Sequence, residues 1–239
     1  MFPKVSPQGR SAVVFDLDGT LVDSAPDIAA AINAVLDEAG RRALSLDEVR
    51  GMVGDGTSAL VSRALAAADG GIEPAQAVLS PLVARFRTVY EACATDETRP
   101  YPGAVDAIRA LDTAGYRMAL CTNKPDRPAR AILEAFGLAP FINAVVGGES
   151  APARKPDSRH LSAVLDLMGA RPDTAVMVGD GINDVLVARA LGVPVVLASF
   201  GFSRSAPEPH TADAVIHRFD QLGAVLARLQ PARIEAERS

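Results

Sequence analysis

The chain has 239 residues, of which 49% are hydrophobic and 22% are charged, and its formal net charge is -5. This composition is that of a globular protein and excludes collagen-like and disordered chains. The negative charge argues against a nucleic-acid surface, which needs clustered Lys and Arg. No run approaches the roughly 20 apolar residues that cross a bilayer. We therefore expect a soluble cytoplasmic protein, a monomer or homodimer, with neither a nucleic-acid nor a membrane partner.

Short apolar runs alternate with helical patterns along most of the chain. The runs are too short for helices and are bounded by turn residues, which predicts buried strands. They cover residues 12–15, 118–122, 144–146, 175–178 and 193–197. The helical patterns, several of which end at a glycine as C-caps prefer, cover residues 104–114, 127–136, 158–168, 183–191 and 220–229. Strands that alternate with helices predict an α/β, Rossmann-like fold with a parallel sheet.

The stretch from residue 25 to about residue 96 interrupts this alternation. It is helical throughout, and its first part carries an amphipathic stripe at helical spacing. The stripe consists of Ile28, Ala31, Ile32, Val35 and Leu36. We therefore expect an all-helical cap domain of residues 24–96, inserted into a core domain of residues 1–23 and 97–239.

Polar residues follow the predicted strands, where parallel α/β sheets gather their functional loops. They are Asp16, Asp18 and Thr20 after the first strand, Thr122, Asn123 and Lys124 after the second, Lys155 in a loop that enters a helix, and Asp180, Gly181 and Asp184 after the fourth strand. Converging carboxylates repel one another without a cation, which implies a bound metal. Because these loops contain no His or Cys, Mg²⁺ fits better than Zn²⁺.

Each of these features alone has a structural explanation. The pair Asp18 and Gly19 is common in turns, a single Lys155 is usually a solvated surface residue, and Asp184 could simply cap a helix. The ordered set at successive strand ends favours a site. In that site Lys155 and the Thr122 hydroxyl could hold the oxygens of a phosphate.

Four motifs carry a resemblance to a known family. They are FDLDGTLVDS at 15–24, CTNK at 121–124, RKPD at 154–157 and GDGIND at 179–184. In this order the chain resembles the haloacid dehalogenase-like (HAD) phosphatases, and its helical insert resembles that family's C1 cap. The segments VGDG at 53–56 and TRPYPG at 98–103 resemble the phosphoglycolate phosphatase branch. Gly181 stands where many relatives have serine, which removes a hydroxyl but no metal ligand.

The resemblance implies a mechanism. Asp16 is the nucleophile that forms an aspartyl-phosphate, and Asp18 protonates the leaving alcohol and then deprotonates the hydrolytic water. The resemblance also implies ligands and binding residues. The ligands of Mg²⁺ are Asp16, the Asp18 backbone carbonyl and Asp180. Asp184 lies behind them as a partner of metal-bound water or of Lys155. The phosphate is bound by Thr122, Asn123 and Lys155.

The cap would select the substrate, a small phosphorylated metabolite. A helix with free N–H groups at its start, which could receive a small carboxylate, follows Gly54, Asp55, Gly56 and Thr57. Arg63 lies further along this helix. A plain capped helix with Arg63 in solvent explains these residues equally well. The leading hypothesis is hydrolysis of 2-phosphoglycolate. The alternatives are a sugar-phosphate or pyrophosphate phosphatase, a phosphomutase of the β-phosphoglucomutase type, and a non-catalytic phosphate-binding module.

Overall fold

The computed structural model describes residues 2, 4, 11–202 and 212–229, which contain a six-stranded parallel sheet in the order β5-β4-β1-β6-β7-β8. The strands are β1 (Ala12–Phe15), β4 (Arg117–Cys121), β5 (Ile142–Val146), β6 (Ala175–Gly179), β7 (Val195–Ala198) and β8 (Ala214–Ile216). The predicted α/β fold class is therefore confirmed. The edge strand β8 was not predicted, since three residues hold too little pattern to identify a strand.

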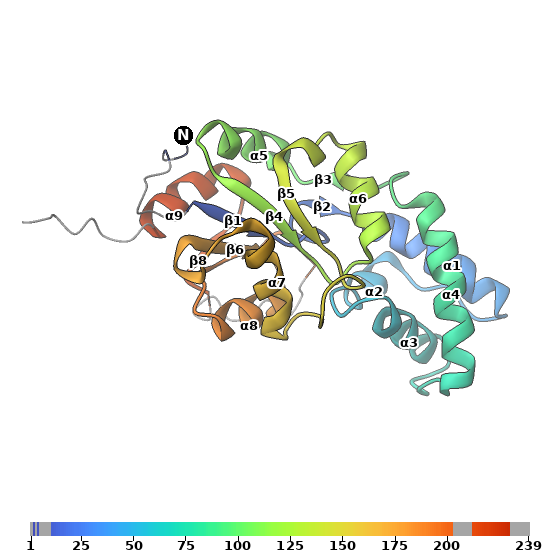
Figure 1. The fold of residues 1–239 in the computed structure, drawn as a ribbon. Helices are drawn as coiled ribbons and strands as arrows, with labels where there is room; N and C mark the ends of the chain where they lie inside the picture. The colour runs from blue at the N-terminus through green and yellow to red at the C-terminus, as the bar shows by residue number, and fades with distance from the viewer. Residues whose placement is uncertain (1, 3, 5–10, 203–211, 230–239) are drawn as a thin grey trace, which may run out of the picture.

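Helices cover both faces of this sheet (Figure 1). One face packs against α5 (Ala104–Thr113), α6 (Asp126–Ala135) and α9 (Leu222–Leu229), and the other packs against α7 (Ser158–Met168) and α8 (Ile182–Ala190). Short 3-10 turns are η1 (Ala139–Phe141), η2 (Pro172–Thr174) and η4 (Phe219–Gln221). Because both faces are covered, the strands are apolar at successive positions rather than at alternate ones.

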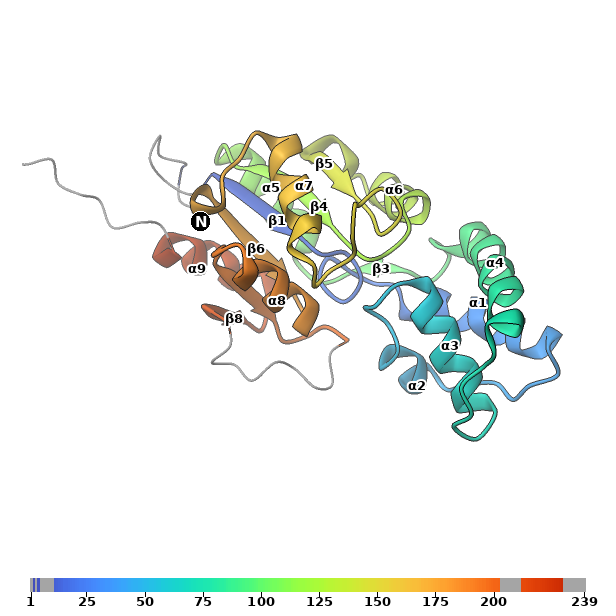
Figure 2. The ribbon, with the colours of Figure 1, turned by 60° about the horizontal axis from the view of Figure 1, so that its bottom comes forward.

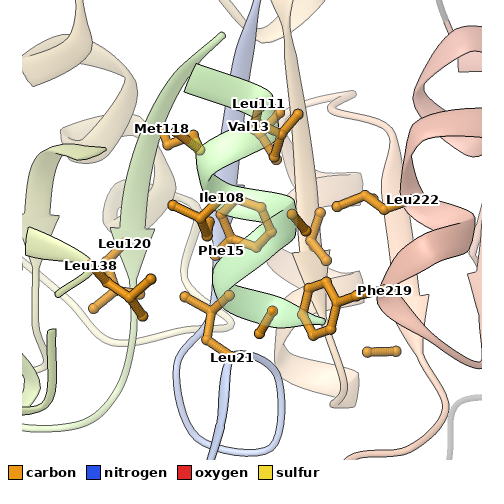
Figure 3. Packing of buried hydrophobic residues seen from close by; sticks show 14 of the residues in the cluster. Val13, Phe15, Leu21, Ile108, Leu111, Met118, Leu120, Leu138, Phe219 and Leu222 are labelled. Atoms are coloured by element: carbon orange, nitrogen blue, oxygen red, sulfur yellow. The ribbon is translucent and has the colours of Figure 1, made fainter. Parts of the chain in front are cut away.

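Alternate residues of β1 enter two different core clusters. Val13 and Phe15 pack with Ile108 and Leu111 of α5, as Figure 3 shows, whereas Val14 lies in the cluster beneath α7 and α8. All of these side chains are fully buried. Burial on both faces fixes the register of β1, and with it the place at which the chain leaves the sheet after Phe15.

Four helices form a separate body beside the carboxyl ends of the strands (Figure 2). They are α1 (Ala25–Glu38), α2 (Leu46–Arg50), α3 (Thr57–Ala68) and α4 (Gln76–Cys93). The predicted stripe of α1 is buried in their shared apolar cluster. The chain enters and leaves this helical cap through β2 (Val22–Asp23) and β3 (Arg99–Pro100), which pair in an antiparallel ladder. No helix within the described ranges combines the length and the apolar character that a membrane span requires.

Candidate active site

The first loop of the site leaves the sheet directly after β1. The Asp16 N–H still donates to the Val178 carbonyl of β6 at 2.9 Å, and the Leu17 N–H donates to Asp16 Oδ1 at 2.7 Å. Backbone bonds from residues 20, 21 and 22 then return to the Leu17 carbonyl. This tight turn holds both Asp16 and Asp18 at the carboxyl end of the sheet.

Gly19 lets the turn approach the loop that follows β6. Its φ is +79°, a left-handed conformation that favours glycine, and a Cβ at this position would overlap the Asp180 carboxylate. Asp180 is held from two further sides, since its Oδ1 accepts from the Thr20 hydroxyl at 3.1 Å and its Oδ2 accepts from the Phe202 N–H at 2.8 Å. The close backbone approach therefore brings Asp180 to Asp16.

Three buried carboxylates lie together at the carboxyl ends of the strands. Ligand oxygens of Asp16, Asp180 and Asp184 all lie within 4.8 Å of one another. Burial raises the pKa of Asp16, Lys155 lowers it, and the charges of Asp184 and Asp18 raise it again, so that the pKa lies at about 6 overall. Burial, followed by Asp184 and Asp16, also raises the pKa of Asp180. A cation would relieve this repulsion, and a donor set of oxygens alone fits a hard divalent ion such as Mg²⁺.

Lys155 supplies a positive charge within the acidic cluster. Its Nζ lies 3.0 Å from Asp16 Oδ1 and 2.7 Å from Asp184 Oδ1. Burial alone would lower the pKa of Lys155, but Asp16 and Asp184 outweigh burial and raise it, so the ammonium stays charged. Asp184 is fixed in turn, because its Oδ2 accepts from the Gly181 N–H at 3.0 Å.

Two buried side chains support the backbone of Lys155. Its N–H donates to Asn123 Oδ1 at 2.9 Å and to His160 Nδ1 at 3.1 Å. The Asn123 amide donates to the carbonyls of Lys155, at 3.0 Å, and Gly54, at 2.9 Å. The sequence predicts that Asn123 binds phosphate, and Asn123 lines the cavity. Its side chain also joins the loop around Lys155 to the cap. Thr122 lines the cavity and accepts from the Lys124 N–H at 3.3 Å, and an accepting hydroxyl can still donate its own proton.

A contact between the cap and Asp18 was missed by sequence reasoning. Lys124 Nζ lies 2.8 and 3.0 Å from the two Asp18 oxygens, and it also donates to the Tyr90 hydroxyl of α4. The Ser24 hydroxyl donates to Asp18 Oδ1. Lys124 was noted at a strand end without a role, and Tyr90 falls in the apolar stripe of α4, where nothing in the local pattern distinguishes it from a core residue.

A cavity of about 170 Å³ lies between the edge of the sheet and the cap. The sheet side presents Asp16, Asp18, Thr122, Lys155, Asp180 and Asp184, among others. The cap side is largely apolar and includes Ile28, Val53, Leu60 and Phe86, together with Arg50. The arrangement encloses the carboxylates of Asp16 and Asp18 and two lysines in a space suited to a small molecule.

The predicted cap residues divide into two groups. Gly54, Gly56 and Thr57 line the cavity, whereas Asp55 and Arg63 are not among its lining residues and pair with each other. Asp55 Oδ1 also accepts from Asn183 Nδ2 at 2.6 Å, and Arg63 donates to the Met52 carbonyl at 3.1 Å. The Arg63 side chain is 44% exposed. Arg50, which sequence reasoning did not select, is the arginine of the cap that lines the cavity within the part of the chain that the structure describes.

The fold and the site define an enzyme with a Rossmann-like parallel-sheet core, in which a carboxylate pair at the end of the first strand faces a helical insert. The chain belongs to the haloacid dehalogenase-like hydrolases, whose family model matches residues 11–223. The family resemblance read from the motifs is thereby confirmed.

Individual relatives match over most of their length. The chain is 46% identical to the phosphoglycolate phosphatase of Caulobacter vibrioides, covering 87% of each chain, and 44% identical to that of Rhodospirillum rubrum, covering 92% of each. Among solved structures, a predicted phosphoglycolate phosphatase from Haemophilus somnus is similar with a TM-score of 0.84 and 29% identity, over 90% of this chain and 97% of the other.

Proposed function

We propose that the protein is a Mg²⁺-dependent phosphatase that hydrolyses 2-phosphoglycolate to glycolate and phosphate. The chain is a phosphoric monoester hydrolase of the HAD class. The observation that carries the finer proposal is the pair of Asp16, which is buried, and Asp18, which is partly buried: both face a small capped cavity, with Lys155 against the first carboxylate. The relatives named phosphoglycolate phosphatase support the choice of substrate.

Asp16 acts as the nucleophile. Its carboxylate attacks phosphorus, the bond to the leaving glycolate oxygen breaks, and an aspartyl-phosphate forms that water then hydrolyses. Lys155 lies 3.0 Å from Asp16 and stays charged, so it offsets the negative charge that gathers as the phosphoryl group transfers. Thr122, together with the lysine, binds the phosphoryl oxygens.

Asp18 acts as the general acid and then as the general base. It gives a proton to the glycolate oxygen in the first step and takes one from water in the second. Ser24 and Lys124 hold its carboxylate at the cavity wall, so one orientation serves both steps.

Asp16 and Asp180, whose carboxylate oxygens lie together with one of Asp184, would hold Mg²⁺. The Asp18 backbone carbonyl would complete the set, as the family resemblance implies. When bound, the ion neutralises charge between the nucleophile and the phosphoryl group. The assignment rests on the oxygen donors and on the mutual repulsion of the acidic cluster.

The cap, residues 24–96, excludes bulk water and selects the substrate, while residues 1–23 and 97–239 form the catalytic core domain. A cavity of about 170 Å³ favours a small ester. We place the protein in the cytoplasm as a monomer or a homodimer that acts on a small phosphorylated metabolite. An intact carboxylate pair argues against a non-catalytic phosphate-binding module.

A substrate panel tests the proposal. The full chain with Mg²⁺ is assayed for phosphate release from 2-phosphoglycolate, hexose phosphates and pyrophosphate, and β-glucose 1-phosphate is followed for isomerisation. We expect kcat/KM for 2-phosphoglycolate to exceed the others by at least about tenfold. Equal turnover of a hexose phosphate would remove the substrate assignment, and isomerised product without phosphate release would indicate a mutase. Activity that survives EDTA would contradict the metal assignment.

A further inference from the structure

Arg50 brings a positive charge to the cap side of the cavity. It is the last residue of α2, and its side chain is 33% exposed. Among the described residues that line the cavity, it is the one charged side chain that the cap contributes. The wall around it is apolar, with Ile28, Leu60 and Phe86 all at least nine-tenths buried.

The other cations of the cavity are already committed to the edge of the sheet. Lys124 pairs with Asp18, and Lys155 lies between Asp16 and Asp184. A second negative group, carried by the part of the substrate that points away from the reacting phosphate, would therefore meet Arg50. A neutral polar group would gain less there, because an apolar wall does not replace its hydrogen bonds to water.

Arg50 is held in place and can still bind a ligand. Its Nη2 lies 2.6 Å from Asp23 Oδ2, and Asp23 accepts through Oδ1 from the Ala25 N–H at 3.2 Å. Asp23 belongs to β2, the strand through which the chain enters the cap. A guanidinium has five N–H donors in a planar fork, so it can keep this carboxylate and present other donors to a second one.

We propose that Arg50 is the specificity-determining residue of the cap, and that it binds a carboxylate on the non-phosphate end of the substrate. This inference rests on the proposed function and assigns the recognition of the second anion to α2 rather than to Arg63. Substrates that carry only the phosphate lose this contact, which separates phosphorylated carboxylic acids from neutral phosphate esters.

Two esters of nearly equal size test the inference. 2-Phosphoglycolate carries the carboxylate, and 2-hydroxyethyl phosphate replaces it with a neutral hydroxymethyl group. We expect Arg50→Gln to lower kcat/KM for 2-phosphoglycolate by about 10- to 100-fold, mainly through KM, as for the loss of a hydrogen-bonded charge. The value for 2-hydroxyethyl phosphate should stay within about threefold. Arg50→Lys should restore part of the preference, because it keeps the charge without the fork.

Arg85→Gln provides the matched control. Arg85 is also a cap arginine in an ion pair, 2.6 Å from Glu38, but it is not among the residues that line the cavity, so both esters should react as in the wild type. If Arg50→Gln slows both esters equally, or neither, while the wild type keeps its preference, the inference is overturned and the proposed function stands. If the wild type itself does not prefer 2-phosphoglycolate, the proposed substrate fails and the inference fails with it.

Discussion

The two walls of the cavity are built in opposite ways. The edge of the sheet is a buried network of charges, in which Lys155 joins Asp16 and Asp184 and each member has a fixed partner. The cap wall is apolar, and Arg50 is its one charged side chain among the described lining residues. The charged groups at the carboxyl end of the sheet can take part in a reaction. The cap wall can select a substrate by its size and, as we propose, by the charge of Arg50.

Hydrogen bonds from the loops of the core to the cap join the two sides of the cavity. Asn123 donates to the Gly54 carbonyl, Asn183 donates to Asp55, and Lys124 donates to Tyr90. Since Lys155, Asp16 and Asp184 pair with one another without a partner from the cap, most changes in the cap should alter which ester enters more than how it is cleaved, with the contact between Tyr90 and Lys124 as the exception. This separation is what the following predictions test, beginning with the largest effect.

Replacement of Asp16, the proposed nucleophile, should abolish activity whatever the cap selects. Asp16→Asn keeps the size of the side chain and removes the attacking carboxylate, so we expect kcat to fall by at least about 10⁴-fold, measured as phosphate release. Asp112→Asn, at an exposed position of α5, is the control and should leave kcat unchanged. Residual activity above about one per cent would place the nucleophile elsewhere.

Alanine variants of two glycines with the same backbone conformation, one beside the carboxylates and one in the cap, should differ in their effect on kcat. Gly19 has a φ of +79°, and a Cβ there would overlap Asp180; Gly40, after α1 in the cap, has a φ of +67° with no atom within 4 Å of such a Cβ. Both alanine variants pay the left-handed backbone cost of about 1 kcal/mol. Only Gly19→Ala should lower kcat, by about 100-fold, because displacement of a positioned catalytic group costs that much. Equal kcat in the two variants would show that the close approach at the edge is unimportant for activity.

A buried histidine behind the site should also appear in the pH dependence of stability. His160 is buried against the backbone of Lys155, and burial lowers the pKa of His160 from 6.5 to about 4. The unfolded chain therefore binds the proton at higher pH than the folded one. The stability that neutral His160 provides is complete above about pH 6.5 and is lost as the pH falls toward 4. Between pH 7 and pH 5 this loss is about 2 kcal/mol.

Urea unfolding of the wild type and His160→Gln at the two pH values measures this effect. The raised pKa of Asp16 acts with the opposite sign, since its folded form binds a proton more readily, so the difference between the two proteins carries the prediction. We expect the wild type to lose about 2 kcal/mol more than the variant on going from pH 7 to pH 5. Parallel pH profiles would mean that His160 does not titrate differently in the two states.

The sequence predicts the fold well because its signals are local. The runs that became β1, β4 and β6 are apolar on both faces, and the glycines that end helices mark their boundaries. The two-residue strands β2 and β3 were missed, because antiparallel pairing between residues 22–23 and 99–100 leaves no local pattern. The edge residues were selected by their order along the chain, and the structure gathers them around one cavity.

The cap was harder to interpret because its side chains reach the cavity through tertiary packing. Arg63 lies on α3 beside the buried stripe of Leu60, Val61 and Ala64, and its helical position already indicated exposure. Arg50 ends a helix of five residues, too short for a periodic signal, and only the packing of that helix directs it inward. Specificity residues in such an insert follow from the docking of the cap on the core, which no single segment encodes.

The smallest predicted effect concerns an aromatic contact that crosses between the walls. Tyr90 stacks on Phe86 with ring centroids 5.5 Å apart, and Lys124 Nζ lies 4.6 Å from the Tyr90 ring centre. Tyr90→Phe keeps both ring contacts and removes only the hydroxyl that accepts from Lys124, which in turn holds Asp18. We expect kcat to fall by about 3- to 10-fold with little change in KM, as for the loss of one hydrogen bond. Tyr116→Phe, directly before β4 at the opposite edge of the sheet, is the control for loss of a tyrosine hydroxyl. A change in KM alone would instead show that the Tyr90 hydroxyl acts in substrate binding. Tyr90 would then belong with the cap residues that select the ester, and its contact with Lys124 would not matter for cleavage.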